Sequence, residues 1–287
     1  MKVFYLGPPK TFSERAASSL AAGLGSPIEL IPQANLQRVA QESAADPKDA
    51  AGVVAYYNFL EGLIQESLDL IYEHGLTIRG ACRLPVEFSI GVNEITEPGL
   101  QPIYSHPKGL AQCSDFLGEH YRDSVLRPVA STAEAARLVK ESRRGMAIAS
   151  SDALLEQGLT IRRRDIGNKR SNRQNFTDFL LVSAAKETAA TAQGEAFRTM
   201  VAITPRTERV GLLSEILAQF NFYNLNIAKI HSRPAIDPIE MSIEPQMFYL
   251  EVMSGADGED LRRCADALDY RYGGHSVRVL GSFPSLG

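Results

Sequence analysis

The segment from Gln174 to Ser183 places the strongest limit on the fold, because a polar cluster there runs directly into an apolar strand. This strand closes the first two thirds of the chain, after a pattern of strands and helices that restarts near Leu76. A first α/β unit that is interrupted by a second α/β unit and completed afterwards predicts two lobes joined by two chain crossings. The cleft between such lobes closes on ligands, and Thr177 and Asp178 stand at its edge. Taken alone, the segment also fits an ordinary turn before a strand.

The bulk composition indicates a globular protein of two domains. Among 287 residues, 44% are hydrophobic and 22% are charged, so each domain can bury a core. The net charge is −4, and the one basic run, Arg162–Arg164 followed by Lys169, Arg170 and Arg173, is short. A solvated face explains this run better than an anion-attracting patch, and the charge does not favour nucleic acid as a partner.

The cysteines and the N-terminus bear on chemistry and location. Cys82, Cys113 and Cys264 lack metal-ligand spacing, and we expect reduced thiols packed as small hydrophobes. The sequence as a whole indicates neither a metal nor an organic cofactor. The chain starts with a short apolar strand, Val3–Leu6, and has no apolar span of membrane-crossing length. We expect a cytoplasmic protein without a membrane partner.

Polar residues follow two strands of the first predicted lobe. After the strand at 2–6, Thr11 and Glu14 have the spacing of a capping box, whose helix would offer free N–H groups to an anion. The strand 51–55 runs into a segment where Asn58 lies among aromatic residues, and these predict a wall for a small ring. Glu61 is expected in the first turn of the helix that follows, where the helix dipole alone would favour a carboxylate.

The last third of the chain has a different order of elements. Residues 186–197 lack apolar periodicity and are interpreted as a linker. Beyond it we expect strand 198–204, helix 210–222, strands 226–233 and 246–253, helix 258–270 and strand 275–281. This βαββαβ order predicts an α+β, ferredoxin-like domain.

Several motifs in a fixed order resemble those of a known family. They are Gly7-Pro8, Thr11-Phe12-Ser13, Tyr104-Ser105-His106-Pro107, Ser131-Thr132-Ala133-Glu134 and Ala147-Ile148-Ala149-Ser150. Together they resemble the prephenate dehydratase family over residues 1–185. The last domain, 198–287, resembles the ACT regulatory domain of those enzymes through Gly211-Leu212-Leu213, Asn226-Ile227-Ala228-Lys229 and His231-Ser232-Arg233-Pro234.

This resemblance implies a fold and a division into domains. The catalytic domain, residues 1–185, would be α/β and two-lobed, like a type II periplasmic binding protein. Its lobes would comprise about 1–75 with 165–185, and 76–164. An α+β, ferredoxin-like ACT domain would follow the linker.

The departures from the family pattern point to a particular branch. A dehydratase has Thr-Arg-Phe where this chain has Thr177-Asp178-Phe179, and Glu-Asn-Ser where it has Tyr57-Asn58-Phe59. An ionised Asp178 would accept a hydrogen bond from the ring hydroxyl of prephenate and make that group harder to expel. The chain thus most resembles the non-aromatising prephenate decarboxylases. These give a dihydro-4-hydroxyphenylpyruvate for specialised metabolism, such as antibiotic biosynthesis.

The resemblance also implies roles for individual residues. Thr177 would orient prephenate and Asp178 would hold its hydroxyl, while the proton donor stays open among Glu61, His106, Tyr57 and water. His106 fits a helix cap equally well. The residues expected to bind substrate are Thr11, Phe12, Ser13, Tyr57, Asn58, Phe59, Ser105 and Phe179.

Two other functions remain open. The chain fits a dehydratase that makes phenylpyruvate from prephenate, or phenylalanine from arogenate, and it also fits a non-catalytic amino-acid sensor. In the ACT domain, an aromatic amino-acid effector would meet Gly211, Leu212, Asn226, His231 and Ser232, although His231 replaces a family glutamate. The alternative is an inert dimerisation module. An exposed edge strand would pair such domains, so we expect a homodimer or homotetramer.

Overall fold

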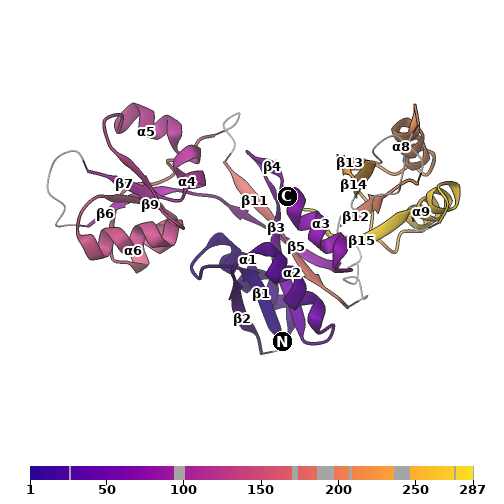
Figure 1. Ribbon diagram of the computed structural model, residues 1–287, viewed down its shortest axis with the longest axis horizontal. Helices are drawn as coiled ribbons and strands as arrows, with labels where there is room; N and C mark the ends of the chain where they lie inside the picture. The colour runs from indigo at the N-terminus through magenta and orange to yellow at the C-terminus, as the bar shows by residue number, and fades with distance from the viewer. Residues whose placement is uncertain are drawn as a thin grey trace.

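The computed structural model describes residues 1–25, 27–93, 101–169, 174–185, 197–206, 209–235, 246–274 and 276–286. These residues form an elongated molecule in which three parts follow one another in a row (Figure 1). No helix in these ranges is long and apolar enough to cross a membrane.

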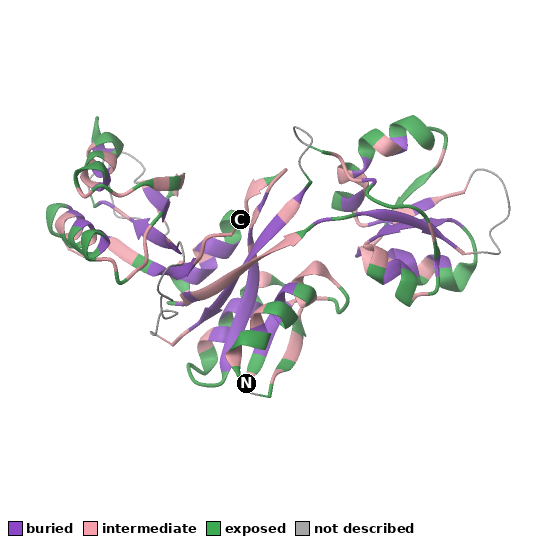
Figure 2. Cartoon of the chain, turned by 180° about the vertical axis from the view of Figure 1, so that it is seen from behind, coloured by how far each residue is buried: buried purple, intermediate pink, exposed green. Residues whose placement is uncertain are grey.

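The central part is the first lobe, a sheet with helices on both faces. Its strands are β1 (Lys2–Leu6), β2 (Glu29–Gln33), β3 (Ala50–Asn58), β4 (Gly62–Leu63), β5 (Thr77–Pro85) and β11 (Phe176–Ser183). They lie in the order β5-β11-β3-β1-β2, with β4 beside β3. Helix α1 (Phe12–Ala21) covers one face, and α2 (Leu36–Ala45) and α3 (Gln65–Glu73) cover the other. Because both faces are covered, β3 and β11 are nearly continuous apolar runs, buried along most of their length (Figure 2).

The second lobe carries its own sheet, in the order β10-β6-β9-β7-β8. The strands are β6 (Ser89–Val92), β7 (Ile103–Ser105), β8 (Leu126–Pro128), β9 (Met146–Ala149) and β10 (Thr160–Arg163). The helices are α4 (Pro107–Gln112), α5 (Ser114–His120), α6 (Thr132–Ser142) and α7 (Ser151–Glu156). Strands β2 and β10 and helices α2 and α7 have no counterpart among the elements expected from the sequence.

Two chain crossings join the lobes, as expected, but one lies later than predicted. The segment 77–85 was assigned to the second lobe, yet it forms β5 and pairs with β11 along its whole length. The first crossing therefore follows β5, and the Val86 N–H donates to the Asn175 carbonyl of the return crossing at 2.8 Å. Strand pairing decides the assignment here, and the apolar pattern of a strand does not reveal its partner.

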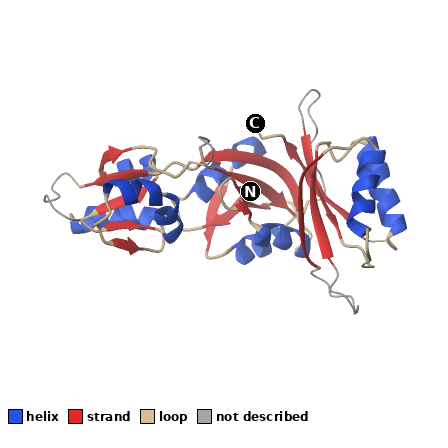
Figure 3. Ribbon diagram, turned by 90° about the horizontal axis from the view of Figure 1, so that it is seen from above, coloured by secondary structure: helices blue, strands red, loops and turns tan. Residues whose placement is uncertain are grey.

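The C-terminal part is an antiparallel sheet with two helices on its outer face (Figure 3). Its elements are β12 (Phe197–Ile203), α8 (Leu212–Phe222), β13 (Ile227–Pro234), β14 (Gln246–Val252), α9 (Glu259–Arg271) and β15 (Val277–Pro284). The strand order β13-β14-β12-β15 confirms the predicted ferredoxin-like fold. Of the expected linker at 186–197, only Phe197 is among the described residues, and it begins β12.

The C-terminal sheet joins the sheet of the first lobe. Gly281 of β15 pairs with Ile78 of β5, so the two sheets are continuous. Gly281 has a φ of 129°, and a Cβ there would lie 2.2 Å from the Ile78 carbonyl oxygen, so only glycine permits this approach. Behind the seam, Met200, Tyr249 and Phe283 share one apolar core with residues of α2 and α3.

Candidate active site

A pocket of about 480 Å³ lies between the two lobes. Its walls come from the N-terminal ends of α1, α4 and α6, the loop after β3 and the start of β11. This volume suits a small-molecule ligand. Most of the expected catalytic and substrate-binding residues line it, namely Thr11, Phe12, Ser13, Asn58, Glu61, His106, Thr177 and Phe179.

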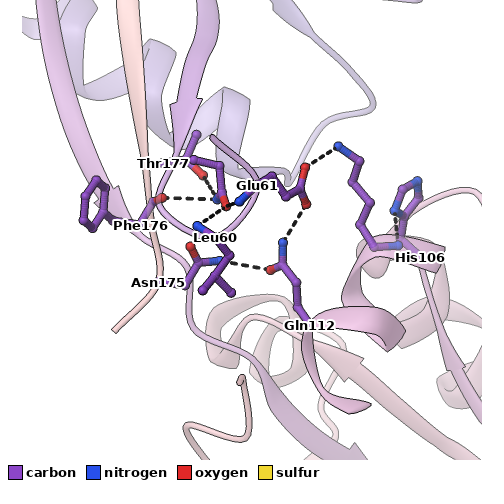
Figure 4. A network of polar contacts seen from close by, with 9 residues as sticks. Leu60, Glu61, His106, Gln112, Asn175, Phe176 and Thr177 are labelled. Atoms are coloured by element: carbon purple, nitrogen blue, oxygen red, sulfur yellow. Dashed lines mark hydrogen bonds and ion pairs between the residues drawn. The ribbon is translucent and has the colours of Figure 1, made fainter. Parts of the chain in front are cut away.

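Asn58 and Thr177 are joined at the floor of this pocket. The Asn58 Nδ2 donates to Thr177 Oγ1 at 2.9 Å and to the Phe176 carbonyl at 3.1 Å (Figure 4). The Asn58 Oδ1 accepts from the backbone N–H groups of Leu60 and Glu61, which fixes the orientation of the amide. Since Thr177 accepts this hydrogen bond, its own hydroxyl proton remains available to a ligand.

Glu61 links the two lobes across the pocket. Its carboxylate accepts from Lys108 Nζ at 2.8 Å and from Gln112 Nε2 at 2.9 Å, both on α4 (Figure 4). Glu61 does not lie in the first turn of a helix, because residues 62–63 form β4 and α3 starts only at Gln65. Glu61 thus accepts hydrogen bonds from two side chains of the second lobe.

His106 is both a helix cap and a pocket residue. It occupies the N-cap of α4, where its Nδ1 accepts from the Lys108 N–H at 3.2 Å. In the neutral ring the other nitrogen, Nε2, then carries the proton. The helix cap that the sequence offered is present, and the same ring lines the pocket.

The N-termini of two longer helices line the pocket from opposite lobes. Thr11 caps α1, but its side chain makes no cap hydrogen bond, and its Oγ1 is buried without a partner among the described residues. Glu14 accepts instead from the Lys10 N–H and the Tyr5 hydroxyl, so the expected capping box does not form. Ser131 caps α6, and its Oγ accepts from the Glu134 N–H at 3.0 Å.

Asp178 does not reach the pocket, and this corrects the role that the sequence predicted for it. Thr177 and Phe179 line the pocket, and alternation along β11 sends Asp178 to the other face. There its carboxylate is only 1% exposed and is paired with Arg83, with Nε to Oδ1 at 2.7 Å and Nη2 to Oδ2 at 3.0 Å. The hydrogen bond from Arg83 to Asp178 is the main reason that the pKa of Arg83 is raised.

Tyr57 and Phe59 also lie away from the pocket. The register between β3 and β11 shifts, so that Asp178 pairs with Tyr57 but Phe179 pairs with Ala55. The extra residue of this bulge turns Tyr57 to the face of the C-terminal part, where Lys229 Nζ lies 3.9 Å from its ring centroid. Phe59 stacks on Phe176 at a centroid distance of 5.1 Å. The predicted aromatic wall thus lies behind the sheet.

Ser105 is the remaining expected residue outside the pocket. It is fully buried within the second lobe, where its Oγ donates to the Ile148 carbonyl at 2.7 Å. The hydroxyl thus satisfies a backbone carbonyl of β9 and does not line the pocket.

Lys108 and Gln112 are pocket residues that were not expected from the sequence. Both lie on α4, four positions apart and therefore on one face, directly after the motif that contains His106. That spacing was the available signal. Within the described part of the chain, no three metal-ligating side chains come together.

The expected effector residues are spread over the C-terminal part. His231 and Ser232 line a smaller pocket of about 280 Å³, together with residues of β4 and α3. Burial lowers the pKa of His231, and the neighbouring Lys229 lowers it further. Gly211 is the N-cap of α8 with a φ of 85°, and Leu212 is buried beside it. The Asn226 Nδ2 contacts the Met253 sulfur at 3.1 Å. These last three residues do not line the smaller pocket.

Comparison with known proteins gives a consistent result. Residues 3–187 match the family model described as prephenate dehydratase. The bifunctional chorismate mutase/prephenate dehydratase of Pseudomonas aeruginosa is 30% identical, with 99% of this chain and 73% of that protein covered. The prephenate dehydratase of Bacillus subtilis is 29% identical, with 99% of both chains covered.

A solved structure agrees with these relatives. The prephenate dehydratase from Arthrobacter aurescens in complex with L-Phe superimposes with a TM-score of 0.81 at 25% identity, over 99% of this chain and 90% of that one. The fold is thus a type II periplasmic-binding-protein-like catalytic unit with a C-terminal ACT-like domain. From the family match, the relatives and the lining of the pocket together, this chain belongs to the prephenate dehydratase family.

Proposed function

We propose that the pocket converts prephenate to phenylpyruvate by loss of carbon dioxide and water. The observation that carries this proposal is the Thr177 hydroxyl, which Asn58 orients as a donor at the pocket floor. Curated relatives named prephenate dehydratase support the same reaction. The finding that Asp178 faces away removes the main argument for retention of the ring hydroxyl.

The reaction breaks two bonds of the ring. The electron pair of the bond to the departing carboxylate moves into the diene, and the carbon–oxygen bond at the opposite ring carbon breaks. The hydroxide needs a proton to leave as water, and aromatisation drives the process. Thr177 would donate a hydrogen bond to the departing oxygen, where negative charge develops.

Proton delivery is assigned to His106. The imidazolium form of His106 would give its Nε2 proton to the leaving hydroxide and become a neutral ring, and this ring lines the pocket. Tyr57 lies on the other face of the sheet, and Glu61 accepts hydrogen bonds from α4, from Gln112 as well as from Lys108. The N-termini of α1 and α6 would hold the anionic groups of the substrate, since each helix end carries about half a positive charge.

Non-aromatising decarboxylation is the second candidate, because Asp178 stands where the family has an arginine. In this reaction the same electron pair would take up a proton at a ring carbon, and the hydroxyl would stay on the ring. The product would then serve specialised metabolism. A sensor without catalysis is the third candidate.

One incubation separates these candidates. The purified protein is mixed with prephenate near neutral pH, and the ultraviolet spectrum and the product mass are followed. Loss of both carbon dioxide and water, with the phenylpyruvate signal, supports the dehydratase. Loss of carbon dioxide alone assigns the decarboxylase, and binding without turnover assigns the sensor.

We also propose that an aromatic amino acid regulates the enzyme through the ACT-like domain. The related structure from Arthrobacter aurescens was solved with L-Phe, and here His231 and Ser232 line a pocket on β13. Strand β13 lies at the end of the sheet, so two copies could pair there as a homodimer. A flat activity curve against added phenylalanine or tyrosine would argue against this regulation.

A further inference from the structure

Lys108 supplies the one full positive charge in the lining of the active-site pocket, within the described residues. The other charged residues there are Glu61 and Glu66, so the lining is net negative unless His106 is protonated. Prephenate carries two carboxylates. A pocket of this charge needs a cation that can turn from its protein partner to the ligand.

Glu61 holds Lys108 in a way that permits such an exchange. The Lys108 side chain is 65% exposed and that of Glu61 is 37% exposed, and an ion pair so open to water is weak. Gln112 also donates to Glu61, and Asn175 Nδ2 donates to Gln112 Oε1 at 3.1 Å, so Glu61 keeps a partner when the lysine leaves. We infer that Lys108 binds the carboxylate of the pyruvyl side chain of the substrate, in place of Glu61.

The choice between the two substrate carboxylates follows from the chemistry. The ring carboxylate loses its negative charge as carbon dioxide departs. A cation on it would stabilise the bound substrate more than the transition state, and would slow the reaction. The pyruvyl carboxylate keeps its charge throughout, so a cation there strengthens binding equally in both states. This inference rests on the proposed substrate, and it holds for both the aromatising and the non-aromatising reaction.

The test compares Lys108→Gln, Lys108→Arg and the wild-type protein. Phenylpyruvate retains the pyruvyl carboxylate and lacks the ring carboxylate, so it reports on the first alone. With Lys108→Gln we expect the KM for prephenate and the inhibition constant of phenylpyruvate to rise together, by about tenfold, with kcat changed less than about twofold. Lys108→Arg should restore most of the affinity. Lys169→Gln is the matched control, because Lys169 is a similarly exposed, ion-paired lysine outside the pocket lining.

Glu61→Gln gives an opposite expectation. It removes the charge that competes with the substrate for Lys108, so phenylpyruvate should bind roughly two- to fivefold tighter to this variant. Circular dichroism melting of each variant shows that the fold is retained.

The results that would overturn the role of Lys108 differ from those that would overturn the proposed reaction. An unchanged KM, or a raised KM with an unchanged phenylpyruvate constant, overturns the inference, and the second result would assign Lys108 to the ring carboxylate. Calorimetric titration with prephenate and phenylpyruvate needs no turnover. Binding to the wild-type protein without product formation therefore defeats the proposed reaction, while the Lys108→Gln titration still decides the inference. If neither compound binds the wild-type protein, both proposals fail.

Discussion

Thr177 and Asp178 are neighbours in β11, yet one faces the pocket and hydrogen bonds with Asn58, while the other lies behind the sheet, paired with Arg83. The two residues are adjacent in the sequence motif, but their side chains point to opposite faces of the sheet. Any effect of Asp178 on the reaction therefore passes through the position of β11.

Asp178→Arg should destabilise the protein without changing which product forms. A second guanidinium would be buried beside Arg83, and loss of a buried pair costs about 3–5 kcal/mol. Urea denaturation measures the loss, and mass analysis of the product gives the ratio of phenylpyruvate to hydroxyl-retaining product. The charge-swapped double variant Arg83→Asp with Asp178→Arg should recover part of the stability. A changed product ratio in a stably folded Asp178→Arg protein would return Asp178 to the chemistry.

Thr177→Val should lower kcat by about 100-fold, as expected when one donor to a developing negative charge is removed. Its shape is nearly that of threonine, so KM and the melting temperature should change little. Steady-state kinetics with prephenate provides the measurement. Thr177→Ser keeps the hydroxyl, and its kcat should stay within about tenfold of the wild-type value. Equal losses in both variants would mean that the hydroxyl has no role.

Asn58→Asp should be about as harmful as Thr177→Val. The new carboxylate still accepts from the Leu60 and Glu61 N–H groups, but it cannot donate to Thr177. The Thr177 hydroxyl would then donate to Asp instead of to the substrate. A double-mutant cycle checks this, because adding Asn58→Asp to Thr177→Val should cause little further loss of kcat. Additive losses would show that the two residues act separately.

Gly281→Ala should destabilise the protein by about 3 kcal/mol or more, since the added Cβ meets the Ile78 backbone and the φ is positive. Chemical denaturation is again the measurement. Gly23→Ala is the control, because a Cβ at Gly23 would have no neighbour within 4 Å, and its effect should stay within about 0.5 kcal/mol. Similar stability of the two variants would argue against a tight seam.

Cys82 should react slowly with iodoacetamide. Burial, followed by the charge of Asp178, raises the pKa of this thiol from 9.0 to about 11. At pH 8 its thiolate population is then about 100-fold lower than that of an unperturbed thiol. Peptide mapping should show the rate rising with pH up to about 11. The same shift favours the folded state below pH 9, and this contribution is lost as the pH rises through about 11. Fast labelling at pH 8 would contradict the assignment.

The sequence predicts the C-terminal fold well, since each strand and helix there has its own apolar period and clear ends. It also predicts which loops meet at the cleft, because the strand ends carry Asn58, His106 and Thr177. It fails where long-range pairing decides. The bulge that turns Tyr57 away exists only between β3 and β11, and β5 belongs to the first lobe only through its contact with β11.

The partners of charged residues are equally hidden. Glu61 and Lys108 are 47 positions apart, and Arg83 and Asp178 are 95 apart. Nothing local to either sequence neighbourhood marks these pairs. The sequence alone placed Asp178 at the substrate because it does not reveal the pairing of Asp178 with Arg83.

The seam between Gly281 and Ile78 has a consequence for dissection of the protein. An ACT-like domain is a natural candidate for truncation when the catalytic part is to be studied alone. Here, however, the apolar core is shared, because Met200, Tyr249 and Phe283 pack against the first lobe. Removal of the chain from β12 onward would expose that apolar face of the lobe to solvent. It would also leave the outer edge of β5 free to pair with strands of other molecules. A truncated catalytic fragment would therefore be prone to aggregate, and its poor behaviour would be no measure of what the regulatory part contributes to catalysis.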